Sequence, residues 1–268
     1  MKIINYEPLS SEPYVDMVKT EENIRDNILK NIDSLPVEFN YVNIPIAQTI
    51  NKYGVGRIQQ VIDDIEQKYP VTKRYVCQHI LVDKINFYNN TIFTPHTLQQ
   101  DAKICIPHYN NVITKNNFIN PEKRKYKTTF IGSCNTHPIR KQLFEINNDR
   151  GIIIRDTGSW FYEKSKLERE KYSNKYVEFL CNSLVGLCPP GTGPSTIRLY
   201  EAMAAGVIPV VFNSVKVPPR FEQFVIRINN VEDFKDLEID SLVKKSRDLY
   251  KLYWSNLSST EVYKLLIT

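Results

Sequence analysis

A glycine- and proline-rich turn in the second half of the chain is followed by charged residues at spacings that suit anion binding. Gly191 and Gly193 lie in the turn, where the backbone can approach a ligand closely. Residues 195–205 predict a short helix, whose first N–H groups and the cation of Arg198 together form an anion site. One helical turn later, Glu201 can accept hydrogen bonds from ribose hydroxyls. The segment therefore predicts a site for a nucleoside diphosphate.

Residues 188–211 resemble the C-terminal signature of the exostosin-like glycosyltransferases. That signature reads Cys-Pro-Arg-Gly-x-Gly-Pro-x-Ser-x-Arg-Leu-x-Glu-Ala, followed by a turn of small residues and Ile-Pro-Val. The chain matches it at Cys188, Pro189, Gly191, Gly193, Pro194, Arg198, Leu199, Glu201, Ala202, Gly206, Ile208, Pro209 and Val210. It departs from the signature at two positions. Pro190 stands where the family has an arginine, so another cation must replace that phosphate contact or donor affinity falls. Thr196 stands where the family has a serine, and it keeps the hydroxyl.

Two upstream segments extend the resemblance to residues 124–225. Residues 126–133 read as a strand ending in Phe-Ile-Gly, followed by Arg140 on the next predicted helix, and residues 176–183 resemble the helix before the Cys-Pro strand. The resemblance implies that the donor is bound by Gly132, Ser133, Arg140, Gly191, Thr192, Gly193, Pro194, Ser195, Thr196, Arg198 and Glu201. Of these, Arg140 and Arg198 are the expected phosphate ligands, because guanidinium groups stabilise a departing nucleoside diphosphate.

Apolar periodicity predicts alternating strands and helices, and therefore parallel sheets of the α/β class. Strands are expected over residues 37–44, 74–82, 91–94, 103–106, 128–131, 151–154, 184–188 and 207–211. Helices are expected over residues 21–34, 57–68, 138–147, 168–181, 195–205 and 240–254. Pro209 is unusual in a buried strand and indicates that the strand ends there or lies beside the donor cleft.

The resemblance implies a GT-B-like architecture with two Rossmann-like domains whose parallel sheets face a central cleft. We expect residues 1–115 to form the acceptor-side domain and residues 116–240 the nucleotide-sugar-binding domain. Residues 241–268 are expected to form a C-terminal helix that packs back toward the N-terminal domain.

The implied reaction is an inverting, metal-independent transfer of a sugar from a nucleotide sugar to a hydroxyl of a glycan or glycoprotein. A UDP-sugar is the expected donor, with UDP-xylose the more specific expectation. The other main glycosyltransferase architecture holds Mn²⁺ or Mg²⁺ through an Asp-x-Asp motif, which this sequence lacks. Asp63 and Asp64 lie mid-helix, where adjacent side chains diverge. No metal and no cofactor besides the donor substrate are expected.

An inverting transferase needs a carboxylate or histidine that deprotonates the acceptor hydroxyl. Asp83 is the first candidate, because it follows the strand predicted over residues 74–82, at a sheet edge that faces the expected cleft. The alternatives are His79, His96, Asp101 and His108, and the sequence does not choose among them.

The acceptor is expected to contact a loop predicted over residues 45–56. The candidate residues there are Gln48, Thr49, Asn51 and Tyr53. Tyr88 or Trp160 can add an aromatic platform, because sugars present apolar C–H faces.

The composition is that of a soluble globular protein. The 268 residues are 42% hydrophobic and carry a formal net charge of +5. The sequence contains no run of about 18 apolar residues, so no membrane span is predicted. The first residues lack the apolar core of a signal peptide. Five scattered cysteines without a Cys-x-x-Cys pair indicate reduced thiols. The animal and plant enzymes of the family that the chain resembles typically carry an N-terminal membrane anchor, so the resemblance without an anchor implies a cytoplasmic protein of bacterial or viral origin, in the latter case in the host cytoplasm. The oligomeric state stays open.

Two other interpretations compete with an active transferase. A catalytically inactive nucleotide- or glycan-binding relative of the same fold is favoured by Pro190 and by the short chain. A nucleic-acid-binding protein is suggested by the basic residues 123–127, but these lack interleaved aromatic side chains, and a solvated linker explains them better. No nucleic-acid partner is expected.

Overall fold

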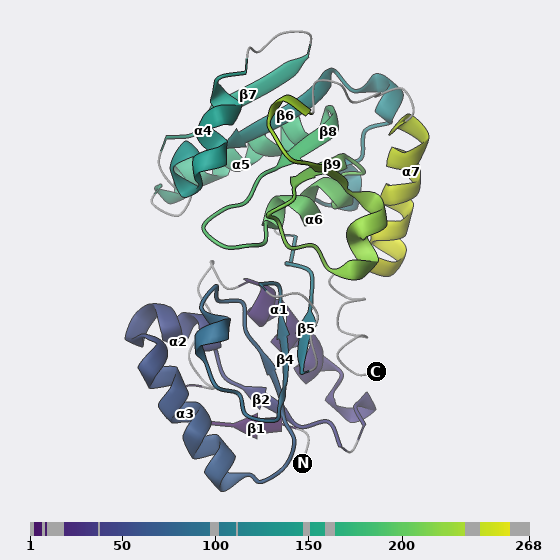
Figure 1. The fold of residues 1–268 in the computed structure, drawn as a ribbon. Helices are drawn as coiled ribbons and strands as arrows, with labels where there is room; N and C mark the ends of the chain where they lie inside the picture. The colour runs from purple at the N-terminus through teal and green to yellow at the C-terminus, as the bar shows by residue number, and fades with distance from the viewer. Residues whose placement is uncertain are drawn as a thin grey trace. The chain divides into compact units, whose positions relative to one another are not determined.

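The chain folds into two α/β units, each built on a parallel sheet of five strands (Figure 1). The boundary between the units lies between Tyr109 and Asn110. The computed structural model describes residues 3–6, 9, 19–36, 38–96, 102–110, 112–146, 151–158, 164–233 and 242–257. The α/β class and the parallel sheets predicted from the sequence are confirmed.

The first unit has its strands in sequential order, β1-β2-β3-β4-β5, all parallel. The strands are β1 (Ile3–Asn5), β2 (Tyr41–Asn43), β3 (Arg74–Val76), β4 (Thr91–Thr94) and β5 (Lys103–Cys105). The helices are α1 (Lys19–Lys30), α2 (Ile46–Tyr53) and α3 (Val55–Lys68).

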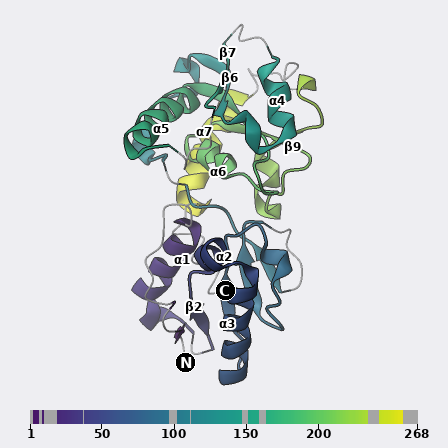
Figure 2. The same ribbon diagram turned by 90° about the vertical axis from the view of Figure 1, so that its left-hand side faces the viewer.

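Helices cover both faces of this sheet, and Figure 2 shows α1 and α3 on opposite sides of β2. The apolar stripe of α3, which includes Ile58 and Ile62, packs with Tyr75. Val76 packs instead with Ile24 of α1. Because successive strand residues point to opposite faces, one short strand supplies both layers of the core.

The second unit has the strand order β10-β9-β8-β6-β7, again all parallel. The strands are β6 (Tyr126–Gly132), β7 (Ile152–Asp156), β8 (Ser183–Cys188), β9 (Ile208–Phe212) and β10 (Ile226–Ile228). The helices are α4 (Pro138–Phe144), α5 (Lys166–Cys181), α6 (Ile197–Ala204) and α7 (Leu242–Leu252). From β6 the chain first adds β7 on one side of the sheet and then crosses over to add β8 on the other side of β6. The direction in which strands are added to the sheet therefore reverses between β6 and β8.

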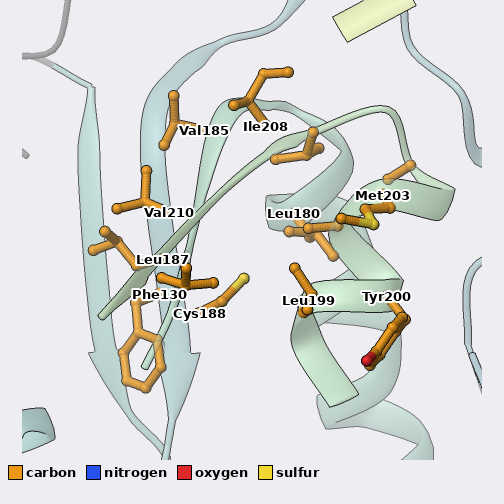
Figure 3. Close-up of a cluster of buried hydrophobic side chains, with 14 of the residues drawn as sticks. Phe130, Leu180, Val185, Leu187, Cys188, Leu199, Tyr200, Met203, Ile208 and Val210 are labelled. Atoms are coloured by element: carbon orange, nitrogen blue, oxygen red, sulfur yellow. The ribbon is translucent and has the colours of Figure 1, made fainter. Parts of the chain in front are cut away.

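The core of the second unit lies between its central strands and α6 (Figure 3). Phe130 and Leu187 from the strands lie opposite Leu199 and Met203 of α6, all of them buried. Burial of a large apolar side chain contributes about 1.5–3 kcal/mol, so this layer fixes α6 against the carboxyl half of the sheet.

Helix α7 packs against α6, β8 and β9. Contact is close at Gly206, which ends α6 with a φ of 65° and where an added Cβ would lie 2.8 Å from the Cβ of Tyr250. The described part of the predicted C-terminal helix therefore packs on the second unit, and residues 258–268 lie outside the described residues.

Arg124 joins the start of the second unit to the first residue of β8 and to the turn after α6. Its buried guanidinium donates hydrogen bonds of 3.0 Å to the carbonyls of Ile119, Ser183, Ala205 and Gly206. The middle of the basic segment is thus part of the fold, whereas the sequence predicted a solvated linker. Its neighbours Lys123 and Lys125 are exposed, as that prediction requires.

Two predictions of secondary structure in the first unit were wrong. Residues predicted to form a loop over 45–56 form helix α2 and the start of α3. The strand predicted over 74–82 ends at Val76 and continues as a loop and a short 3₁₀ turn, Val82–Lys84. The three-residue strands β1 and β10 were not predicted.

Pro209 lies inside β9, so the strand does not end there, and the alternative that it lies beside the donor cleft stays a prediction. Pro209 pairs with Gly186 of β8, but β10 pairs with β9 only from Val210 onward. At Pro209 the strand therefore has a neighbour on one side only, and the missing N–H is tolerated as it is on an edge strand.

Candidate functional site

Arg198 lies at the carboxyl end of β6, although it is carried by the first turn of α6. Its guanidinium carbon is 4.3 Å from the ring centroid of Phe130 and 5.2 Å from that of Tyr176. One terminal nitrogen, Nη2, donates a hydrogen bond to the carbonyl of Ile131. The other, Nη1, is buried and has no partner among the described residues. The rings and the carbonyl therefore fix a cation that keeps an unused donor.

Arg140 of α4 brings a second cation to the same place. Its Nε donates to the carbonyl of Pro190 at 2.9 Å, and its Nη1 donates to that of Ser133 at 3.1 Å. Burial, followed by the like charge of Arg198, lowers the pKa of Arg140 to about 9. Arg140 therefore remains charged at neutral pH, and its repulsion from the neighbouring guanidinium of Arg198 favours an anion beside them.

Two of the predicted glycines make room for these arginines. A Cβ on Gly132 would lie 3.1 Å from Nη2 of Arg198 and 3.6 Å from Nη1 of Arg140. A Cβ on Gly191 would lie 3.5 Å from Nη2 of Arg140. The structure thus brings Gly132, Ser133, Arg140, Gly191 and Arg198 together beside the carboxyl ends of β6 and β8.

Glu201 lies one turn after Arg198 on α6 and is buried, with 6% of its surface exposed. Its Oε2 accepts a hydrogen bond of 2.6 Å from the hydroxyl of Tyr176. Burial raises the pKa of Glu201, while the bond from Tyr176 and the charge of Arg198 oppose that shift. Tyr176 was not predicted as a site residue. The sequence feature that could have indicated it is the pair Tyr176 and Val177, which lies on the inner side of a mostly polar helix.

The remaining predicted donor residues form the turn and its surroundings. Ser133 and Thr196 are buried, Ser133 as the cap of a 3₁₀ turn and Thr196 as the N-cap residue of α6. Ser195 is also buried, whereas Thr192 is exposed. Gly193 precedes Pro194, whose carbonyl accepts a bond of 2.7 Å from the backbone N–H of Lys216 in the loop after β9.

In the first unit, a buried carboxylate that sequence reasoning missed occupies the carboxyl edge of the sheet. Both oxygens of Glu21 accept a hydrogen bond of 3.1 Å from the N–H of Ala47 in the first turn of α2. Oε1 also accepts a bond of 2.7 Å from the N–H of Gln78 after β3. Burial raises the pKa of Glu21 to about 8, and these bonds oppose the shift. The sequence feature that could have indicated a buried Glu21 is its position on the apolar face of α1, which it shares with Ile24 and Ile28.

Three of the proposed catalytic bases follow the ends of strands in this unit. His96 follows β4 and His108 follows β5; both are buried, with ring centroids 5.2 Å apart. Burial, followed by the neighbouring His96, lowers the pKa of His108 well below its usual value. His79 follows β3; its Nδ1 accepts a bond of 3.1 Å from the N–H of Leu81, and burial lowers its pKa.

Asp83 differs from these histidines, because it is paired with a lysine at the opposite end of a strand. Its carboxylate forms an ion pair of 2.6 Å with Lys103, the first residue of β5, and is 56% exposed. Lys103 is at the amino end of β5, whereas a base at the predicted crevice belongs at the carboxyl ends of the strands. Asp101, the remaining candidate, lies outside the described residues.

The predicted acceptor residues lie on α2 and differ in accessibility. Thr49 is fully buried, and its hydroxyl donates a bond of 2.8 Å to the carbonyl of Pro45. Gln48 is also buried. Asn51 is exposed, and its Oδ1 lies 3.2 Å from Nε2 of His79. Tyr53 is exposed, with the Lys52 ammonium 4.8 Å from its ring centroid.

Of the two predicted aromatic platforms, Tyr88 is exposed and donates a bond of 2.8 Å to Asp63 of α3. Trp160 lies outside the described residues. Within the described ranges, no three His, Cys, Asp or Glu side chains are grouped closely enough to hold a metal ion. No helix in the described part of the chain is long and apolar enough to cross a membrane.

Similarity to solved structures identifies the fold. The chain is similar to WaaG, a glycosyltransferase involved in lipopolysaccharide biosynthesis, with a TM-score of 0.51 and 10% identity over 99% of this chain and 98% of WaaG. It also matches AviGT4, a glycosyltransferase involved in avilamycin A biosynthesis, with a TM-score of 0.43 and 10% identity over 95% of this chain and 89% of AviGT4. The likeness to WaaG places the two parallel-sheet units in the GT-B fold class.

Similarity in sequence identifies the family. The chain is 31% identical to Exostosin-1 of Drosophila melanogaster over 121 residues, which are 40% of this chain and 15% of the fly protein. It therefore aligns with only a small part of that relative's length. The family model of the Exostosin GT47 domain matches residues 61–234, which is well over half of the chain and includes Arg140, Arg198 and Glu201. This chain belongs to the exostosin GT47 family.

Proposed function

We propose that this protein is a glycosyltransferase that moves a sugar from a nucleotide sugar to a hydroxyl of a glycan or glycoprotein. The observation that carries the proposal is the pair Arg140 and Arg198 beside the carboxyl ends of β6 and β8. These strands flank the point where the sheet changes direction, which is where open α/β sheets bind nucleotides. Two fixed cations there suit a diphosphate leaving group, whose negative charge grows as the sugar departs.

The second unit is proposed to bind the donor, which we take to be a UDP-sugar, with UDP-xylose as the first to test. Arg140, which matches an arginine of the family, is hydrogen-bonded to the carbonyl of Pro190 and adjoins Gly191, and it is proposed to make the phosphate contact that Pro190 has lost as well as its own. Glu201 is proposed to accept hydrogen bonds from the ribose. The first unit then binds the acceptor.

We propose an inverting reaction that needs no metal, in which the two arginines and the first N–H groups of α6 stabilise the departing diphosphate. The base is proposed to come from the carboxyl edge of the first sheet. His96 and His108 suit this role better than Asp83, because they lie within three residues of the carboxyl ends of β4 and β5, whereas Asp83 is paired with Lys103.

The test is a thermal-shift screen with UDP, GDP, CMP and a panel of nucleotide sugars, with and without EDTA. A ligand at 100 times its Kd stabilises a protein by about 2.7 kcal/mol, which a melting curve resolves. We expect one nucleotide to stabilise the wild type with EDTA present, and Arg198→Ala to lose this effect. Arg57→Ala, an exposed arginine of α3, is the matched control and is expected to keep it. No stabilisation by any nucleotide contradicts the proposal.

A nucleotide-binding relative without activity is the second candidate, and Pro190 favours it by removing a cation from the family's motif. Transfer and hydrolysis of the stabilising nucleotide sugar decide between the two. Binding without either reaction, over a broad acceptor panel, supports the inactive relative.

A further inference from the structure

We propose that Tyr176 is a positioning residue for the donor nucleotide, ordering the two charged groups of α6 from the neighbouring helix α5. Its hydroxyl holds the carboxylate of Glu201, and its ring holds the guanidinium of Arg198. The inference rests on the proposed function, in which Glu201 accepts bonds from the ribose and Arg198 binds the diphosphate.

The hydroxyl sets the orientation of the carboxylate. Tyr176 donates to Oε2 of Glu201 at 2.6 Å, a length typical of a charge-assisted hydrogen bond. Burial and the charge of Glu201 raise the pKa of Tyr176 well above its ordinary value, so the phenol keeps its proton and acts as the donor. The bond engages one carboxylate oxygen and leaves recognition of the ribose to Oε1. Without this bond the buried carboxylate would be free to rotate away from the ligand.

The ring has a separate effect on the cation. Arg198 lies within 5.2 Å of two aromatic ring centroids, those of Phe130 and Tyr176. Both contacts favour the charged guanidinium and limit its movement. With Nη2 bonded to Ile131, these rings hold the unpartnered Nη1 in one place. A group that is fixed before the ligand arrives loses less entropy on binding.

The two effects can be separated by substitution. Tyr176→Phe removes the hydroxyl and keeps the ring, whereas Tyr176→Leu removes both. Tyr126→Phe is the matched control, because Tyr126 begins β6 and lies at the opposite end of that strand from Gly132. Calorimetric titration with UDP and with 2′,3′-dideoxy-UDP measures the dependence on ribose hydroxyls, and KM and kcat for the nucleotide sugar are measured alongside.

We expect Tyr176→Phe to weaken UDP binding roughly tenfold, the loss of a hydrogen bond to a charged group, and to leave dideoxy-UDP binding unchanged. The KM for the donor should rise with kcat nearly constant. Tyr176→Leu should weaken both ligands, because Arg198 loses one of its rings. The control should bind both as the wild type does.

Three outcomes contradict the inference in distinguishable ways. If Glu201→Gln weakens UDP binding but Tyr176→Phe does not, the inference fails while the proposed function stands. If Tyr176→Phe weakens both ligands equally, its hydroxyl does not act through the ribose. If Arg198→Ala and Glu201→Gln both bind UDP as the wild type does, the proposed function fails and the inference with it. Should Tyr176→Leu not fold, the Phe variant decides alone.

Discussion

At the scale of single residues, Gly132 determines where the two arginines can lie. An alanine there would place its Cβ 3.1 Å from Arg198 and 3.2 Å from the ring of Phe130, closer than ordinary van der Waals contact. We expect Gly132→Ala to displace the guanidinium and weaken UDP binding roughly tenfold, since a hydrogen bond to a charged group contributes about 1.5–3 kcal/mol. Calorimetric titration measures the loss.

Gly56→Ala is the control for this substitution, because Gly56 lies in α3 with nothing within 4 Å of an added Cβ. Alanine favours a helix over glycine by about 1 kcal/mol, so this variant should be slightly more stable and bind UDP unchanged. Unaltered UDP affinity in Gly132→Ala would show that Arg198 does not contact the nucleotide.

The residues of the donor site were predictable to the extent that they lie in one motif. Gly191, Arg198 and Glu201 share a short stretch of sequence with fixed spacing, and Gly132 and Arg140 follow a recognisable strand. Tyr176 and Glu21 were missed because each acts through a tertiary contact, with Glu201 in one case and with the N–H of Ala47 in the other. No local pattern encodes such a partner.

At the scale of secondary-structure elements, Arg124 connects three chain segments through one side chain: its own, the start of β8 and the turn after α6. Arg124→Ala would remove the donor to the buried carbonyls of Ser183 and Ala205, while the carbonyl of Gly206 would keep its hydrogen bond from the Ser246 hydroxyl. We expect the free energy of unfolding to fall by about 3 kcal/mol, measured by urea denaturation. The exposed neighbour Lys125 provides the control, and Lys125→Ala should change stability by less than about 0.5 kcal/mol. Equal effects of the two substitutions would argue against this role.

Glu21 connects α1, α2 and the loop after β3, and it should make the stability of the first unit depend on pH. Its pKa is about 8 in the folded protein against an ordinary value of 4.5, so the folded state binds the proton more tightly than the unfolded state. The resulting stabilisation is complete below pH 4.5 and is lost as the pH rises through 8.

We therefore expect the unfolding free energy of the wild type to fall more steeply over this pH range than that of Glu21→Gln, which cannot titrate. Urea denaturation at a series of pH values measures both slopes. Parallel slopes would mean that Glu21 does not change its protonation between the folded and unfolded states.

The elements themselves were predicted best where they are long and periodic, as in α3, and worst where they are short. Helix α2 was mistaken for a loop, because its sequence contains residues that are weak helix formers, such as Thr49 and Asn51. The run after Val76 is rich in apolar residues, yet it leaves the sheet, since the backbone N–H of Gln78 bonds to Glu21. Tertiary contacts decided both cases.

At the scale of the whole molecule, the proposed division of labour between the units can be observed by hydrogen exchange. We expect UDP alone to slow amide exchange in residues 131–140 and 189–201, which contain the donor-site contacts, and to leave α3 of the first unit unchanged. Adding an acceptor glycan should then slow exchange in α2. Protection of the first unit alone by UDP would reverse the proposed assignment of donor and acceptor units.

The α/β class followed from the alternation of strands and helices, and the two-domain plan from the family resemblance, but the order of the strands in each sheet followed from neither. Strand order depends on which buried faces meet, and only the assembled cores show that β6 lies between β7 and β8. That arrangement, with Arg140 and Arg198 beside it, could not be obtained from spacing along the chain.

The distribution of thiols gives each unit its own internal probe of opening. Cys77 and Cys105 are buried in the first unit, Cys181 and Cys188 in the second, and only Cys134 is partly exposed. Burial raises the pKa of Cys188 to about 12 and that of Cys181 to about 11, so neither reacts as a thiolate while the fold is closed. With Cys134 replaced by serine, the rate of alkylation at each remaining site, followed by mass spectrometry, reports which half of the protein opens first.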